Sequence, residues 1–283
     1  MKSREIENIA RLKQISRATI DKDWVLGHFL NAFYLFENNK NNFVFKGGTC
    51  LKKCYFEDYR FSEDLDFTLL RANFRIDSQF IHKIINLAEK NSSIKFHLSE
   101  INNQIHNDLQ QGYEIKIKFW GADHKPNSPI LPPSRWQTSI KLDICFTEQV
   151  NDKPYYCKII HPYADSYLIN EIIPAYSISE IIAEKLRALI QRNRPRDIYD
   201  IWYIMNSNIE IDRSAIKELL LLKAENKNIE IISAEQFVNP IKQKKNKRAW
   251  QSSLGQHLAS NAFPEFDFVY KDLSRIVSHI LSY

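Results

Sequence analysis

One stretch, from Phe43 to Leu69, constrains the fold of this chain more than any other. It opens with the apolar run Phe43-Val44-Phe45, whose aromatic and β-branched residues are typical of a strand. The run stops at Gly47–Gly48. Because the chain has only six glycines, this pair indicates a backbone that must approach a ligand closely. We predict a helical turn or two over Cys50 to Phe56, and a second strand over Leu65 to Leu69.

Two acidic side chains mark that second strand. Asp64 and Asp66 are two residues apart, so on a strand they project to the same face. Neighbouring carboxylates repel each other unless a cation lies between them. Ligands that offer only oxygen atoms suit Mg²⁺ better than zinc, so the pair predicts a magnesium site.

A third acid, Asp143, lies in the middle of a strand predicted over Thr138 to Phe146. The apolar residues of that strand alternate onto one face, which must be the core face, and Asp143 lies on the other. A carboxylate in a central strand needs a partner, and a cation held by Asp64 and Asp66 would supply one. The alternative is a strand with one wet face, on which Asp143 is simply solvated.

The composition is that of a globular protein. The chain has 283 residues, 44% of them hydrophobic and 26% charged, which suffices for one large or two modest domains. No apolar run approaches the roughly 18 residues of a membrane span. The charged N-terminus does not resemble a secretory signal, and the four cysteines lack a disulfide or zinc spacing, so we expect a cytoplasmic protein with reduced thiols. The net charge of +5 permits a polyanionic partner.

The apolar pattern divides the chain into three parts. Residues 1–40 are predicted to be helices packed on the core, with His28 as a satisfied core histidine rather than a ligand. Residues 41–170 mix helices with short strands, and residues 171–283 are helical. The strands after the acidic pair are predicted at 94–98, 113–119 and 138–146. We therefore predict an α+β chain with two lobes.

A cationic side chain interrupts the apolar face of the first helix in the last part. Ser177 and Glu180 have the spacing of a capping box at the start of a helix that runs to about Arg192. Lys185 falls on the apolar side of this helix, whereas Arg187 is predicted to point away from it. A lysine in that position either reaches out to solvent or meets an anion.

The next helix and a later basic run supply further candidates. Asp197 and Asp200 are three residues apart and share one helix face, where they either serve a ligand or simply favour the helix dipole by less than about 1 kcal/mol each. A basic run before Trp250 suits phosphate contacts, although most such runs are only solvated surface. Its candidate nucleic-acid-binding residues are Lys242, Lys244, Lys245, Lys247 and Arg248.

Five segments together resemble the motifs of a known family, in the order in which that family has them. They are Lys46-Gly47-Gly48-Thr49-x-Leu51, Arg60 to Asp66, Lys141 to Ile144, Glu184 to Leu189 and Arg196 to Asp200. The segments lie between about residues 43 and 205 and resemble the AbiEii/AbiGii-type toxins of the DNA polymerase β-like nucleotidyltransferase superfamily. The first motif and the RDxYD element together are specific, whereas a double glycine or a DxD alone would be weak.

The resemblance implies a nucleotidyltransferase fold, with a mixed sheet flanked by helices over 41–170 and a helical domain over 171–283 that contributes to an active-site cleft. It implies an NTP substrate and one or two Mg²⁺ ions held by Asp64, Asp66 and Asp143. The implied catalytic set is Asp64, Asp66, Asp143, Lys185 and Asp197. The implied nucleotide-binding set is Lys46, Gly47, Gly48, Thr49, Ser62, Lys185, Arg196 and Asp200.

In function, the resemblance implies the toxin half of a toxin–antitoxin or phage-defence pair. Such an enzyme would transfer NMP from an NTP to an acceptor, foremost the 3′ end of tRNA, with tRNA or another RNA and an antitoxin protein as partners. We expect a monomer without membrane association. Two other classes stay open. A metal-dependent glycosyltransferase also uses a DxD, but here a glycine turn and a short helix replace the βαβ unit that it needs. A catalytically silent fold that only binds RNA or protein has no need of the complete acid set.

Overall fold

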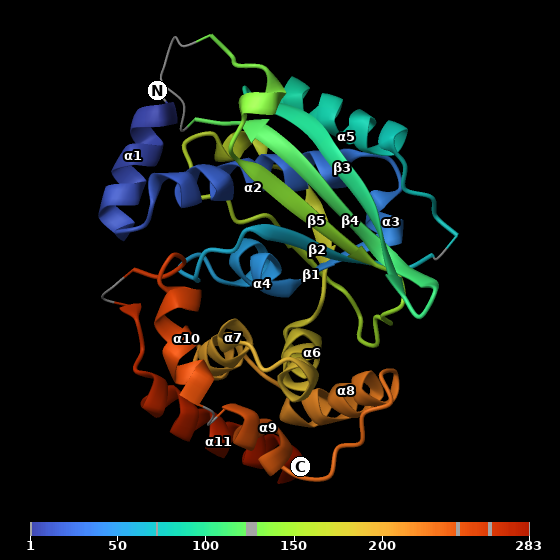
Figure 1. Cartoon of the computed structure of the whole chain (residues 1–283), viewed down its shortest axis with the longest axis vertical. Coiled ribbons are helices and arrows are strands. Elements are labelled where there is room, and N and C mark those ends of the chain that lie inside the picture. The colour runs from blue at the N-terminus through green and yellow to red at the C-terminus, as the bar shows by residue number, and fades with distance from the viewer. Residues whose placement is uncertain (1, 72, 123–128, 242–243, 260–261, 283) are drawn as a thin grey trace. The chain divides into compact units, whose positions relative to one another are not determined.

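The computed structural model describes residues 2–71, 73–122, 129–241, 244–259 and 262–282 (Figure 1). The chain divides into two compact units. One consists of Met1–Val150 with Pro154–Ala175 and is called the sheet unit below. The other consists of Asn151–Lys153 with Tyr176–Tyr283 and is called the helical unit.

The sheet unit is built on a mixed sheet of seven strands in the order β3-β4-β5-β2-β1-β7-β6. The strands are β1 Phe43–Lys46, β2 Asp64–Leu69, β3 Lys95–His106, β4 Leu109–Trp120, β5 Ser139–Cys145, β6 Tyr155–Lys158 and β7 Ile172–Ala175. The pairs β2/β5 and β1/β7 are parallel, and the remaining neighbours are antiparallel. The predicted α+β class with a mixed sheet is confirmed.

Helices cover one face of this sheet. The helical segments of the sheet unit are α1 Lys2–Lys13, α2 Arg17–Leu35, α3 Asn39–Asn42, α4 Gly47–Cys50, η1 Leu51–Tyr55, α5 Ser78–Asn91, η2 Pro133–Arg135 and η3 Ser166–Leu168. The long helices α2 and α5 lie against the sheet, where Phe33 of α2 stacks on Phe67 of β2 with 4.5 Å between ring centroids (Figure 1). Burial of each such ring contributes roughly 1.5–3 kcal/mol. Because strand residues alternate, this face takes the apolar side chains and leaves the polar ones to the opposite face.

A buried ion pair joins α2 to η1, the π-helical turn that follows the double glycine. Asp23 and Lys53 are each about 1% exposed, and their charged groups lie 2.8 Å apart. Lys53 also donates to the Asp23 carbonyl, and the Tyr163 hydroxyl donates to the Asp23 carboxylate at 2.8 Å. The Ile160 amide donates to the Lys53 carbonyl at 2.7 Å, so the segment before Tyr163 is attached to the same turn.

Several elements of the structure are longer than predicted or were not predicted at all. β3 and β4 form a hairpin much longer than the predicted strands, because their outer ends are exposed on both faces and lose the apolar alternation. The helix after β1 begins at Gly47 rather than at Cys50. β6 and β7 were not predicted. Each has only four residues, and Pro174 in β7 counts against a strand.

The helical unit contains six helices and no strand within the described residues of that unit. They are α6 Ile178–Gln191, α7 Pro195–Met205, α8 Arg213–Glu225, α9 Glu235–Ile241, α10 Lys244–Leu254 and α11 Phe266–Ser282. α9 was not predicted. Ser177 caps α6 by accepting from the Glu180 amide at 3.1 Å, as the capping box predicts. The Glu180 carboxylate is used differently, because it accepts from the Asn151 and Asp152 amides and pairs with Lys223 at 2.8 Å.

Among the described residues, none of the helices combines the length and apolar character that crossing a membrane requires.

Candidate active site

Backbone pairing lines up four carboxylates on the polar face of the sheet. Asp66 on β2 pairs with Asp143 on β5, and Asp143 pairs with Glu114 on β4. Residues paired across neighbouring strands project to the same face, and Asp64 joins them because it lies two residues before Asp66. We call Asp64, Asp66, Asp143 and Glu114 the carboxylate patch. All four are partly exposed, so the patch is open to solvent within the sheet unit.

Two neighbouring side chains order Asp143. The Gln104 amide donates to one carboxylate oxygen at 3.0 Å, and the Lys141 ammonium lies 3.7 Å from the other and 3.2 Å from Glu114. Burial would lower the pKa of Lys141, but Asp64, Asp143 and Glu114 outweigh it and raise that pKa. The patch therefore stabilises positive charge placed beside it.

The double glycine bends the chain directly against this patch. Gly47 has φ +81°, a conformation that L-residues rarely adopt, and a Cβ there would collide with the Asp66 carboxylate. A Cβ on Gly48 would lie 2.7 Å from the Arg60 guanidinium and 3.1 Å from the Ser62 hydroxyl. Gly47 is thus required by its backbone conformation and by the closeness of Asp66, whereas a side chain at Gly48 would require Arg60 and Ser62 to move.

The remaining predicted residues of this segment have structural partners. Lys46, which pairs with Asp66 across the strands, forms a short ion pair with Glu148. Thr49 is fully buried, and its hydroxyl donates to the Asp64 carbonyl. Thr49 therefore ties the glycine turn to β2 through its side chain, which is not directed to the exposed face as a nucleotide contact would require. Ser62 is half-buried on the loop that enters β2.

The helical unit holds a second cluster around a buried lysine. Lys185 on α6 is 7% exposed, and its ammonium lies 3.2 Å from Asp197 and 2.7 Å from Asp200, both on α7. Arg192 adds two contacts to Asp197 at 3.0 and 3.3 Å. Burial would raise the pKa of Asp197, but Lys185 and Arg192 lower it. Of the two alternatives for Lys185, the structure shows that it meets anions.

Two arginines have partners that the sequence did not reveal. Arg187, which was predicted to point away from the apolar side of its helix, is 8% exposed and donates to Gln191 at 2.5 Å. Arg196, a candidate for a phosphate contact or a pair with a nearby acid, donates to the Ser253 carbonyl at 3.2 Å and lies 2.7 Å from a His257 nitrogen. These contacts fasten α7 to the end of α10.

The basic run is only partly within the described residues. Lys242 lies outside them, and Lys244 is described only as the first residue of α10. Lys245, Lys247 and Arg248 are exposed on α10, and Lys247 pairs with Asp267 at 2.5 Å.

Sequence reasoning missed the side chains that complete both clusters. Glu114 and Gln104 lie on the β3–β4 hairpin, and they reach Asp143 only through a strand register that one sequence does not reveal. Arg192 was taken only as a helix end, although a basic residue there could have been considered for Asp197.

The donor set of the carboxylate patch fits a magnesium ion. Its members offer only carboxylate oxygens, which is the ligand chemistry that Mg²⁺ prefers. Asp64, Asp66 and Asp143 are the residues that would hold the ion, and the glycine turn lies directly beside them.

Comparison with known proteins identifies the fold and the family. The chain resembles the MenT4 nucleotidyltransferase toxin from Mycobacterium tuberculosis H37Rv, with a TM-score of 0.69 and 16% identity over 100% of this chain and 90% of that one. It also resembles the crystal structure of JHP933 from Helicobacter pylori, with a TM-score of 0.54 and 16% identity over 94% of this chain and 93% of that one. At such identities the likeness shows the fold alone. A search of curated protein sequences finds no match. The sequence model of the nucleotidyl transferase AbiEii toxin family, a type IV toxin–antitoxin system, matches residues 28–272, and the chain belongs to that family.

Proposed function

We propose that this protein transfers a nucleoside monophosphate from an NTP to an acceptor RNA, with the 3′ end of tRNA as the foremost candidate. The observation that carries the proposal is the carboxylate patch, in which Asp66 and Asp143 are paired in register beside a glycine turn. Family membership supports the toxin role and the reaction class. The metal rests on the chemistry of the patch, and the acceptor rests on the family resemblance.

In the proposed reaction, a hydroxyl of the acceptor attacks the α-phosphorus of the NTP, the bond between the α- and β-phosphates breaks, and pyrophosphate leaves. Asp64 and Asp66 would hold Mg²⁺, and Asp143 would contribute to the same ion or to a second one. The bound metal would neutralise charge on the phosphates and orient them for in-line displacement. The amides of Gly47 and Gly48 would bind phosphate oxygens. Asp143 is also the proposed base for the attacking hydroxyl, because Gln104 fixes one of its oxygens.

Residues of the helical unit also have proposed roles in the reaction. Lys185 would neutralise negative charge on the phosphates, and Asp197 and Asp200 would hold its ammonium in place, which their distances of 3.2 and 2.7 Å support. Arg196 is engaged with the end of α10, so an indirect role is favoured over a phosphate contact.

The proposed setting follows from the family. From membership of a type IV toxin–antitoxin family we infer a cytoplasmic enzyme with an antitoxin partner and a role in phage defence. Lys245, Lys247 and Arg248 are exposed and are the proposed contacts for the RNA backbone, together with Lys242 and Lys244.

The test is label transfer to RNA. Purified protein is incubated with total tRNA, Mg²⁺ and each α-labelled NTP in turn. We expect label in tRNA with at least one NTP, and a loss of more than about 100-fold for Asp66→Asn, since that change removes a metal ligand. Glu100→Gln is the matched control, because this exposed carboxylate on β3 lies outside the patch.

Three outcomes contradict the proposal. Transfer of sugar from a nucleotide sugar, with no label from any NTP, indicates a glycosyltransferase. Binding of RNA without transfer of any label indicates a silent fold. Full activity of a folded Asp66→Asn protein removes the patch from catalysis.

A further inference from the structure

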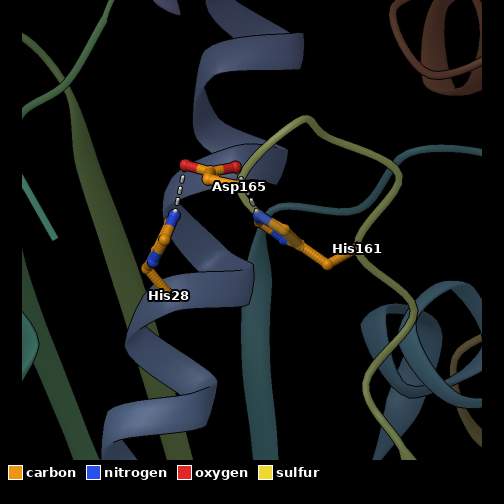
Figure 2. A group of neighbouring side chains, drawn as sticks. All are labelled: His28, His161 and Asp165. Atoms are coloured by element: carbon orange, nitrogen blue, oxygen red, sulfur yellow. Dashed lines mark hydrogen bonds and ion pairs between the residues drawn. The ribbon is translucent and has the colours of Figure 1, made fainter. Parts of the chain in front are cut away.

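A second group of possible metal ligands lies in the sheet unit, on elements that the proposed reaction does not use. Figure 2 shows the Asp165 carboxylate between two imidazoles, with His28 on α2 and His161 on the loop that leads to Asp165. The Nε2 atoms of the two histidines lie 3.1 and 3.4 Å from its oxygens. One ligand atom from each residue falls within 4.8 Å of the others.

These separations suit two ligands of one metal ion, although the 3.1 Å contact of His28 also has the length of an ordinary N–H···O hydrogen bond. A tetrahedral ion with bonds of about 2.0–2.1 Å sets its ligand atoms roughly 3.3 Å apart. A charge-assisted hydrogen bond to a carboxylate is shorter, at about 2.7–2.9 Å. The contact of 3.4 Å between His161 and Asp165 is therefore long for such a bond.

The surroundings also suit a bound ion. The side chains of His28 and His161 are 3% and 1% exposed, whereas that of Asp165 is 15% exposed, so a path to solvent remains on the carboxylate side. The His161 ring packs directly against Gly27, where a Cβ atom would collide with the ring. The packing thus holds both imidazoles in place before any ion arrives.

We propose that His28, His161 and Asp165 form a site for a divalent transition-metal ion of the zinc class, with a fourth position open to solvent. Two imidazoles and one carboxylate are a ligand set for zinc, cobalt or nickel rather than for Mg²⁺. A bound ion would fasten α2 to the segment in which the Ile160 amide donates to the Lys53 carbonyl.

Lys2 competes with the ion for the same carboxylate. Its ammonium lies 2.8 Å from Asp165, and the Trp24 indole donates to the other oxygen at 2.9 Å. The metal-free protein thus satisfies Asp165 with its own donors. The Nδ1 atom of His161 is buried and has no hydrogen-bond partner in the part of the chain that the structure describes. A histidine ligand without such a partner binds a metal about 10- to 100-fold more weakly.

The experiment is a Co²⁺ titration of the full chain, without a histidine tag and after treatment with a chelator. We expect the strong visible absorption of four-coordinate Co²⁺, saturating at one ion per chain and abolished by added Zn²⁺, which binds such sites more tightly. Mg²⁺ at the same concentration should leave the spectrum unchanged. A wild-type protein without this absorption overturns the proposal, whatever its variants do.

Substitutions test where the ion binds. Some should weaken Co²⁺ binding and one should strengthen it. His28→Ala and His161→Ala should each weaken Co²⁺ binding by more than about 100-fold, since even loss of an outer-shell partner costs 10- to 100-fold. His97→Ala, at an exposed position on β3, is the control that should bind normally. Lys2→Gln should tighten binding by about two- to fivefold, because it removes a competing ion pair. Absorption that survives both ligand substitutions, or that Lys2→Gln weakens, overturns the site.

Discussion

Replacement of Lys53 by methionine would remove one partner of the buried ion pair that joins α2 to the π-helical turn η1. The distance of 2.8 Å between the charges corresponds to an attraction of about 6 kcal/mol at an effective dielectric constant of about 20. Each charge also loses several kcal/mol of hydration on burial, so the pair as a whole contributes little. The single substitution leaves the Asp23 carboxylate in the core without its ammonium, and we expect it to lower the free energy of unfolding by about 3–5 kcal/mol.

The pH dependence of this loss gives a second check. Burial would raise the pKa of Asp23, but Lys53 and Lys52 hold it below its ordinary value. In the wild type, the carboxylate therefore stabilises the fold above its unfolded pKa of 3.8, and this contribution is lost as the pH falls. Without Lys53, burial raises the pKa instead, and acid relieves the cost of the buried charge. The difference between variant and wild type should shrink as the pH is lowered from 7 toward 4.

Urea unfolding followed by circular dichroism measures both effects, with separate transitions fitted for the two units where they occur. The control is Lys13→Met, whose pair with Asp58 is largely exposed and should contribute less than about 1 kcal/mol. The double variant Asp23→Leu, Lys53→Met should regain most of the lost stability, because no charge is left buried. A Lys53→Met protein as stable as Lys13→Met at pH 7, or a double variant less stable than the single one, would refute the reasoning.

Three further predictions concern other parts of the molecule. Gly47→Ala should lose NTP binding in equilibrium dialysis and about 1–2 kcal/mol of stability in urea unfolding, because a Cβ collides with Asp66 and the φ of +81° disfavours alanine. Arg192→Gln should raise the pKa of Asp197, because it removes a cation that lowers that pKa. On acidification, the variant should therefore begin to lose stability at a higher pH than the wild type, which thermal unfolding between pH 7 and 3 measures. Glu180→Gln should destabilise the helical unit by about 3 kcal/mol in urea unfolding, because it removes a carboxylate that is fully buried against an ammonium.

The sequence predicts the centre of the sheet better than its edges. β1 is a continuous, mostly apolar buried run, whereas β2 and β5 alternate between apolar and polar residues, so the shared face of Asp64 and Asp66 follows from the sequence. β6 and β7 are too short for a periodic signal. The apolar alternation of β3 is lost in the part of the strand where both faces of the hairpin are exposed to solvent.

The candidate site, like the sheet, was predicted only in part from the sequence. The pairing of Asp66 with Asp143 was predicted from chemistry, since each acid needed a cation, whereas the contribution of Gln104 depends on a strand register that only the structure supplies. The apolar stripe of α6 indicated that Lys185 would be buried. The stripe did not indicate that Arg187 would be buried as well, because a long side chain can bury its stem away from the stripe's centre.

The parallel pairing of β2 with β5 also affects how the protein is made. These strands are neighbours in space but are separated in the chain by α5 and the whole β3–β4 hairpin. Contacts between distant segments form slowly, because a long loop must close before the pairing stabilises it. During synthesis, Asp66 therefore emerges from the ribosome well before Asp143, and a chain that stops before Ser139 has no complete carboxylate patch. Truncated products of this toxin should be catalytically inert, and they should be aggregation-prone because the β2 edge that β5 would cover stays open.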